Sequence, residues 1–213
     1  LDDVLTYYRA PSGEVSTVIG GHTIAAVGSD EMKRKWLPKI AAGELRFWLG
    51  YSEPNAGSDL SSIKTSAVDR GDEFVVNGQK IWSSAAHIAD YAWLLAKTDP
   101  NASKHAGATL MLVDNRSPGI TIRPIINICG IHSFNEVFFD DVRVPKENVV
   151  GGVNQGFYCV MLALQYERIF VGAGAFRRVF EELVGYVKAH AGERISHRDI
   201  GDVRRRLAEL ATE

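Results

Sequence analysis

The sequence predicts an α+β fold in which an antiparallel β-sandwich or barrel is flanked by helical domains. Apolar residues recur every three to four positions before residue 45 and after residue 154, which is the spacing of a helix with one buried face. Between these regions, short β-branched and aromatic runs alternate with turn residues. The runs follow one another too closely for helical crossovers, so neighbouring strands should pair antiparallel. We therefore expect helical residues 1–45, a β domain over 46–153 and a second helical region over 154–213.

Composition excludes several classes of protein. The 213 residues carry 26 acidic and 24 basic side chains, a net charge of −2, so the basic footprint of a nucleic-acid-binding protein is missing. No apolar run approaches about 20 residues, so no membrane span is expected. Two cysteines do not make a disulfide framework, the histidines lack metal-ligand spacing, and no metal is expected. The start lacks the basic and apolar regions of a signal peptide. These features favour a reducing compartment.

The first helical region contains one well-marked helix. Ser29 or Asp30 is expected to cap its start, and Gly43 to end it. Met32 and Trp36 are among the residues of its buried face.

The β region contains a turn signal and two strongly apolar runs. Asn77–Gly78, between Phe74–Val76 and Gln79–Trp82, predicts a hairpin turn. Tyr91–Ala96 and Thr109–Val113 are apolar throughout, which predicts buried strands. Further short strands are expected near Pro118–Gly119, Pro124 and Val137–Phe139.

A carboxylate interrupts the apolar stripe of the last helical region. One long helix is expected from Gly156 to about His190, and Glu167 falls on its apolar face, between Leu164 and Val171. A buried charge needs a partner or a raised pKa. Two interpretations stay open at this point. Either Glu167 pairs with a cation or the stripe ends there, or Glu167 is a general base in a dry site.

Three segments resemble the acyl-CoA dehydrogenase family. Leu49–Asp59 (LGYSEPNAGSD) resembles the family's flavin-binding signature, and Gly78–Ser84 (GQKIWSS) resembles its second flavin-contacting stretch. Phe134–Pro145 (FNEVFFDDVRVP) resembles the segment that closes its β domain. The segments occur in the family's order with compatible spacing, and the resemblance covers nearly the whole chain.

The resemblance implies a fold and an activity. Residues 1–45 would be the end of an N-terminal helical domain, 46–153 a central flavin-binding β domain, and 154–213 the start of a C-terminal helical bundle. The implied activity is FAD-dependent oxidation of an acyl-CoA thioester to a trans-2-enoyl-CoA, as in fatty acid β-oxidation. In the family a glutamate removes the α-proton and a hydride passes from Cβ to flavin N5. A weak carbon acid of this kind requires a desolvated base and donors for the enolate oxygen.

The resemblance also implies cofactor-binding positions. Leu49, Tyr51 and Ser52 would lie beside the flavin ring, and Ser58 would contact both flavin and acyl-CoA. For the serines the alternative role is turn capping, and for the tryptophan of the second stretch it is core packing. Tyr51 departs from the aliphatic residue usual in the signature. The other implied positions are Gly57, Trp82, Ser83, Ser84 and Arg194.

The implied catalytic and substrate-binding residues lie on the last long helix. Glu167 matches the base position of a subset that resembles isovaleryl-CoA and long-chain dehydrogenases, and Arg168 follows it as in that subset. Arg168 and Gln165 match CoA-contacting positions, although Gln165 replaces the usual aspartate. Arg194 would open an Arg-x-x-Phe-Gly stretch, but His197 and Arg198 stand in place of its Phe-Gly.

The implied partners are an acyl-CoA substrate, an electron-transfer flavoprotein and further subunits. Asp202–Leu210 and Phe134–Asp141 resemble actinobacterial-type dehydrogenases of sterol and other bulky acyl-CoAs, many of which are heterotetramers of two related subunits. A homotetramer or a heterotetramer is therefore expected. The expected location is the bacterial cytoplasm, or the mitochondrial matrix in a eukaryote. The alternatives are an acyl-CoA oxidase, a flavin monooxygenase on the same fold, or a subunit that depends on its partner to complete the flavin site.

Overall fold

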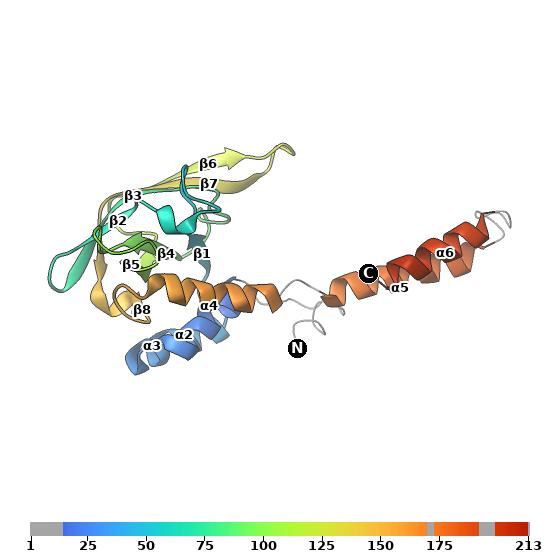
Figure 1. The fold of residues 1–213 in the computed structure, drawn as a ribbon, viewed down its shortest axis with the longest axis horizontal. Coiled ribbons are helices and arrows are strands. Elements are labelled where there is room, and N and C mark those ends of the chain that lie inside the picture. Colours follow the sequence, from blue (N-terminus) through green and yellow to red (C-terminus); the bar gives the residue numbers. More distant parts are fainter. Residues whose placement is uncertain (1–14, 170–172, 192–198, 213) are drawn as a thin grey trace. The chain divides into compact units, whose positions relative to one another are not determined.

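The computed structural model describes residues 15–169, 173–191 and 199–212 (Figure 1). The chain divides into two compact units, one over Gly13–Arg168 and one containing Ile169–Glu213, and each is described separately. The first unit contains helices and a sheet in the order η1 (Ser16–Gly21), α2 (His22–Val27), α3 (Asp30–Ala41), β1 (Phe47–Gly50), η2 (Leu60–Ser62), β2 (Ser66–Asp69), β3 (Glu73–Lys80), β4 (Tyr91–Lys97), β5 (Ala108–Asp114), β6 (Ile120–Ile126), β7 (His132–Pro145), η3 (Lys146–Asn148), β8 (Val149–Val150) and α4 (Gly156–Ile169).

The expected cap and end of α3 are confirmed. The Ser29 hydroxyl accepts a hydrogen bond of 3.1 Å from the Met32 N–H, which satisfies one of the free donors of the first turn. Gly43 follows the helix with a φ of +71°, a conformation that glycine adopts without a steric penalty. Met32, Trp36 and Ile40 are buried on one face, as the spacing predicts.

The eight strands form one sheet in the order β6-β7-β3-β2-β4-β5-β8, with β1 paired to β4. Most neighbours are antiparallel as expected, but β4 pairs in parallel with both β1 and β2. In these pairs Phe47 lies opposite Tyr91, and Ser66 lies opposite Lys97. The prediction of a purely antiparallel domain assumed that strands close in sequence pair, whereas β4 pairs with two strands far from it in the chain. The α+β class with a β-sheet middle region and flanking helices is confirmed.

The predicted hairpin turn at Asn77–Gly78 is wrong. β3 continues through both residues, and its register against β7 shifts between Val76 and Gly78. Gly78 has a φ of +149°, and a Cβ there would lie 2.6 Å from the Thr65 hydroxyl. The Asn77 side chain donates to Asp141 Oδ1 and accepts from the Asp141 N–H, both at 2.9 Å. Between the pairs Val76–Val142 and Gly78–Phe139, β7 has one residue more than β3, so the bulge lies on β7 at Asp140–Asp141, opposite Asn77.

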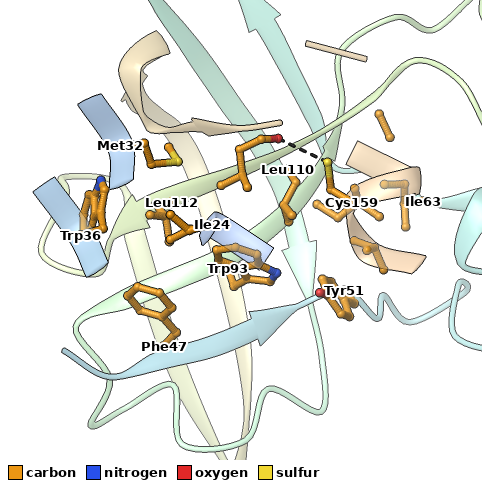
Figure 2. Close-up of a cluster of buried hydrophobic side chains, with 14 of the residues drawn as sticks. Ile24, Met32, Trp36, Phe47, Tyr51, Ile63, Trp93, Leu110, Leu112 and Cys159 are labelled. Carbon is orange, nitrogen blue, oxygen red and sulfur yellow. Dashed lines mark hydrogen bonds between the residues drawn. The ribbon is translucent and has the colours of Figure 1, made fainter. Parts of the chain in front are cut away.

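The two apolar strands β4 and β5 are buried on both faces. Trp93 and Leu112 point into one core with α2, α3 and α4, which cover that face of the sheet (Figure 2). Leu94 and Met111 point into a second core with the side chains of β3 and β7. Both faces are covered, so the runs predicted as buried strands contain no polar alternation.

The long helix expected from Gly156 to about His190 is described in two parts, α4 and α5 (Ala173–His190). Residues 170–172 between them lie outside the described chain, as does Val171 of the predicted stripe. On α5, Val187 is buried, whereas Val179 and Leu183 are exposed. α5 and α6 (Ile200–Leu210) belong to one compact unit, and two helices can bury only one side of each other.

The stretch Gly156–His190 has the length and apolar composition of a membrane-crossing helix, although it passes over residues outside the described chain. Core helices of globular proteins meet the same criterion, and Val160 and Ala163 of α4 are fully buried.

Candidate active site

The two segments that the resemblance assigns to the flavin lie against each other. The Ile81 N–H donates to the Ser52 carbonyl at 2.9 Å, and the Lys80 ammonium donates to the Tyr51 carbonyl at 3.0 Å. Leu49, on β1, and Ser52 are half-buried beside this junction. The end of β1 and the end of β3 are therefore held together by hydrogen bonds of both main chain and side chain.

A buried ion pair between Lys80 and Glu53 stabilises this junction. Lys80 is fully buried and its Nζ lies 2.9 Å from Oε1 of Glu53, whose side chain is 7% exposed. The carboxylate also accepts from the backbone N–H groups of Lys64 and Thr65. Burial lowers the pKa of Lys80 to about 8, and Glu53 partly offsets this. Burial by itself would raise the pKa of Glu53, but Lys80 and the two N–H groups hold it below its usual value, so the pair is ionised at neutral pH.

The second signature stretch ends in a strained loop that presents Trp82 to solvent. Trp82 has a φ of +59° and Ala85 a φ of +58°, a region that residues with a Cβ rarely occupy. The Trp82 side chain is 59% exposed, and its ring meets the edge of Phe134 at 6.4 Å. Ser84 is exposed, whereas Ser83 is buried and its hydroxyl has no hydrogen-bond partner among the described residues. An exposed aromatic ring of this kind is a feature that a bound planar ring would cover.

Asn135, which sequence reasoning did not single out, holds the loop in this conformation. Its side-chain amide donates to the Ser83 carbonyl at 2.8 Å, and its own carbonyl accepts from the Ser83 N–H at 3.0 Å. The same amide lies 3.1 Å from Nδ1 of His87, and Oδ1 lies 2.7 Å from Nε2 of His132. The two imidazole rings stack at 3.8 Å. Asn135 is fully buried, so this network replaces water for the backbone of the strained loop.

The loop at the end of the first signature segment is exposed to solvent. Gly57 and Ser58 are exposed, and neither contacts the Trp82 loop in any hydrogen bond of the described chain. Asp59 follows, and hydrogen bonds from Ser61 and Ser62 hold its pKa below the usual range. Gly57 and Ser58 thus remain accessible to a ligand, and their predicted roles stay predictions.

α4 brings the candidate base to the sheet. Its first residue, Gly156, lies so close to β5 that a Cβ would be 2.5 Å from the Leu110 nitrogen. Cys159 and Val160 then pack into the core, and Leu164 packs partly against it. The next turn carries the exposed residue Glu167. The exposure of Glu167 agrees with the alternative that the apolar stripe ends there, since Leu164 is the last residue of α4 that packs against this core, and the role of Glu167 as a base stays a prediction.

The two predicted substrate-binding residues of α4, Gln165 and Arg168, are also exposed. Arg194 lies outside the described residues. The structure thus brings Leu49, Tyr51 and Ser52 together with the Trp82 loop, and it leaves the role of each predicted residue as a prediction.

Tyr51 connects the junction to α4. It is 8% exposed and belongs to the same core cluster as Cys159 and Val160 (Figure 2). Its hydroxyl has no hydrogen-bond partner among the described residues. Burial raises the pKa of this hydroxyl far above its usual value, and the charge of Glu167 adds to the rise. Tyr51 therefore keeps its proton at neutral pH.

Comparison with known proteins gives two family matches. Residues 5–44 match the family described as acyl-CoA dehydrogenase, N-terminal domain, and residues 49–142 match the family described as acyl-CoA dehydrogenase, middle domain. The chain is 42% identical over 201 residues to acyl-CoA dehydrogenase FadE29 of Mycobacterium tuberculosis, covering 94% of this chain and 51% of that protein. It is 32% identical to the mitochondrial isovaleryl-CoA dehydrogenase of Pongo abelii, covering 87% and 47%.

Solved structures give the same result. The chain resembles a structure titled Tcur3481-Tcur3483 steroid ACAD with a TM-score of 0.87 and 36% identity, covering all of this chain and 55% of that one. It resembles the ChsE4-ChsE5 complex from Mycobacterium tuberculosis with a TM-score of 0.83 and 36% identity, covering 99% and 55%. The chain thus spans about half the length of the relatives it matches.

Proposed function

Because the chain belongs to the acyl-CoA dehydrogenase family, we propose that it provides the flavin-binding face and the catalytic base of an enzyme that oxidises an acyl-CoA thioester to the trans-2-enoyl-CoA. The observation that carries the proposal is the junction at Ser52 and Ile81, which joins two signature segments that are separate in sequence. The loop that follows the second segment presents Trp82 to solvent. Residues 1–45, 46–153 and 154–213 are proposed to be parts of the family's three domains.

FAD is the cofactor that these residues fit. We assign its isoalloxazine contacts to Leu49, Tyr51, Ser52 and the Trp82–Ser84 loop. Gly57, Ser58 and Arg194 are proposed contacts by resemblance alone. When bound, FAD would supply the acceptor for the hydride that leaves Cβ. The exposed Trp82 ring would become buried against it, which offsets the cost of presenting an aromatic surface to water.

Glu167 is the proposed base. Glu167 lies near the end of α4, and its carboxylate would take the proton from Cα of a thioester bound beside it. Arg168 and Gln165 are proposed to contact the CoA moiety. The exposure of Glu167 in the described chain requires that substrate or further protein covers it in the enzyme, because a dry site strengthens a carboxylate base.

The substrate class that the relatives support best is a steroid-derived acyl-CoA. Structures titled as steroid ACADs share 36% identity with this chain, and the ChsE4-ChsE5 title names a complex of two components. We therefore propose that the enzyme assembles with a related subunit and passes electrons to an electron-transfer flavoprotein. A shorter branched or a long straight acyl chain is the competing substrate class.

The test is an anaerobic titration of the holoenzyme, co-expressed with its related subunit, with steroid-side-chain, isovaleryl- and palmitoyl-CoA. Flavin bleaching in the wild type and its loss in Glu167→Gln would support the proposal, and the best thioester would identify the substrate class. The matched control is Glu44→Gln, an exposed glutamate after α3 that should leave bleaching unchanged. Equal bleaching in Glu167→Gln would place the base elsewhere. Hydrogen peroxide as the main product under air would favour an oxidase.

A further inference from the structure

Asn135 connects the Trp82 loop to two histidines, and the hydrogen bonds determine where their protons lie. A carbonyl oxygen can only accept, so the Asn135 side-chain atom 2.8 Å from the Ser83 carbonyl is the amide nitrogen. The same nitrogen lies 3.1 Å from Nδ1 of His87, which therefore has to be an unprotonated acceptor. The Asn135 oxygen in turn accepts from Nε2 of His132, at 2.7 Å. The network is complete only while His87 is neutral.

A proton has different consequences on the two imidazole rings. On His132 it leaves the Nε2–H donor in place and breaks no hydrogen bond. On His87 it sets an N–H against the Asn135 amide, and it puts a positive charge on a ring whose centroid lies 3.8 Å from that of His132. Either the His87 ring or the Asn135 amide then has to turn away. A turned amide leaves the carbonyl of the buried Ser83 without its side-chain donor, which is costly.

The Trp82 loop depends on such bonds because its backbone is strained. Trp82 and Ala85 have φ values of +59° and +58°, and such conformations persist only where the surroundings hold them. In the described chain, two backbone hydrogen bonds join the loop to β7, from the Ser83 N–H to the Asn135 carbonyl and from the Ala85 N–H to the Ser133 carbonyl. The third bond to β7 comes from the Asn135 side chain, so it is the one that a proton on a neighbouring ring can disrupt.

The charged side chains on the segments around the two histidines have other partners. In the turn before β4, on β7 and on β6 these are Asp90, which accepts from the Arg46 N–H at 2.9 Å and lies 3.8 Å from Arg116, Glu136, which accepts from Gln79 at 3.2 Å, and Arg123, which lies over the Phe138 ring at 4.8 Å. Within the part of the chain that the structure describes, the two imidazole rings contact Asn135 and each other. Their protonation therefore acts on the loop through Asn135.

We propose that His87 makes the conformation of the Trp82 loop depend on pH, and with it the affinity of the protein for FAD. Neutral His87 supports the strained conformation that presents Trp82, and protonated His87 releases it. This inference rests on the proposed function, in which the loop contacts the isoalloxazine ring. His87 acts through Asn135 and Ser83, so it is a positioning residue.

The first test is amide hydrogen exchange in the full-length protein, co-expressed with its related subunit, measured on peptides that contain the Trp82 loop. Free histidine takes up a proton below about pH 6.5, so the released loop should gain about tenfold in population between about pH 7.5 and pH 5.5. His87→Gln is the reference, because its amide oxygen can accept from Asn135 and does not titrate. The exchange rate of the wild type divided by that of the variant should therefore rise about tenfold on acidification. A ratio that stays constant would overturn the proposal.

The second test is FAD release from the holoenzyme, followed by flavin fluorescence on dilution. The Kd of the wild type should rise by up to about tenfold between the same two pH values, because only the strained loop would bind. His87→Gln should bind FAD tightly at both pH values. His87→Phe keeps a ring beside His132 but has no acceptor, so it should bind FAD weakly at both.

The matched control for both tests is His190→Gln. The His190 ring contacts Tyr186 on its own helix, α5, so this variant should keep the pH dependence of the wild type. A pH dependence that persists unchanged in both His87 variants would overturn the proposal.

The two proposals fail in different ways. If FAD binds at neither pH, the proposed function and the claim about FAD affinity are overturned, and the exchange ratio still decides whether His87 controls the loop. If FAD binds but neither its Kd nor the exchange ratio changes with pH, the proposed function stands and the role of His87 is overturned.

Discussion

Replacing Lys80 with methionine tests whether the buried ion pair supports the junction of the two signature segments. Methionine keeps most of the apolar stem of lysine, so the change mainly removes the charge and two hydrogen bonds, to Glu53 and to the Tyr51 carbonyl. Breaking a buried pair by removing one partner costs about 3–5 kcal/mol. Glu53 keeps its two backbone N–H donors, so we expect the cost of breaking the pair to be near about 3 kcal/mol, the lower end of this range. The Tyr51 carbonyl, left without its donor, adds about 1 kcal/mol. The expected total is about 4 kcal/mol.

The assay is equilibrium unfolding in urea, followed by circular dichroism, with Lys146→Met as the matched control. Lys146 lies 2.7 Å from Asp69, but the two side chains are 37% and 54% exposed. Exposed pairs contribute about 0–1 kcal/mol, so the control should unfold close to the wild type. If Lys80→Met costs no more free energy of unfolding than Lys146→Met, the argument from burial is refuted.

The pH dependence gives a second check on the same variant. In the wild type the lowered pKa of Glu53 means that its stabilisation is present above the unfolded pKa and is lost as pH falls through the folded pKa. In Lys80→Met, burial without the lysine raises the pKa of Glu53, so the variant gains stability relative to the wild type as the carboxyl takes up a proton. The stability gap should therefore be widest near neutral pH and narrow on acidification. A gap independent of pH would show that lost packing, not charge, causes the destabilisation.

Two further changes test the site's backbone. Gly78→Ala should lower the free energy of unfolding in urea by at least about 2 kcal/mol more than Gly71→Ala does. Both glycines have a positive φ, but only a Cβ at Gly78 would clash, at 2.6 Å from the Thr65 hydroxyl. Equal losses in the two variants would contradict the clash. Asn135→Ala should weaken FAD retention on dilution and speed amide exchange in the loop that follows Ser83, because the loop loses the bond from the Asn135 amide to the Ser83 carbonyl; unchanged exchange would show that this network does not hold the loop.

Local sequence chemistry accounts for some elements and not for others. The cap of α3 depends on residues within one turn, so Ser29 was predictable. Asn77–Gly78 was predicted to be a hairpin turn, but β3 continues through it, and the Asn77 side chain pairs with Asp141, far away in the chain. Tertiary pairing decided that case.

In the candidate site, too, the sequence identifies some residues and not others. The signature residues were located by resemblance, but the groups that hold them in place were not. Lys80 carried a usable signal, since it lies on the same inward face of β3 as Phe74 and Val76. Asn135 carried the same kind of signal, since it lies on the inward face of β7 with Val137 and Phe139, but its bonds to the Ser83 loop come from another part of the chain. The exposure of Glu167 could not be predicted, since a helical stripe does not reveal what covers each of its turns.

The pairing of the strands also determines which of them lack a partner while the chain is being synthesised. β3 pairs with β7, with Glu73 opposite Pro145. β1 pairs with β4, so the backbone hydrogen bonds between them form only after β4 has been synthesised. During synthesis the first three strands therefore leave the ribosome before the partner β7 exists. Sheets whose paired strands lie far apart in the sequence fold slowly, and their unpaired strand edges can contact other chains before folding is complete. The nascent β domain therefore keeps an unpaired edge at β3 until residue 145 has been synthesised.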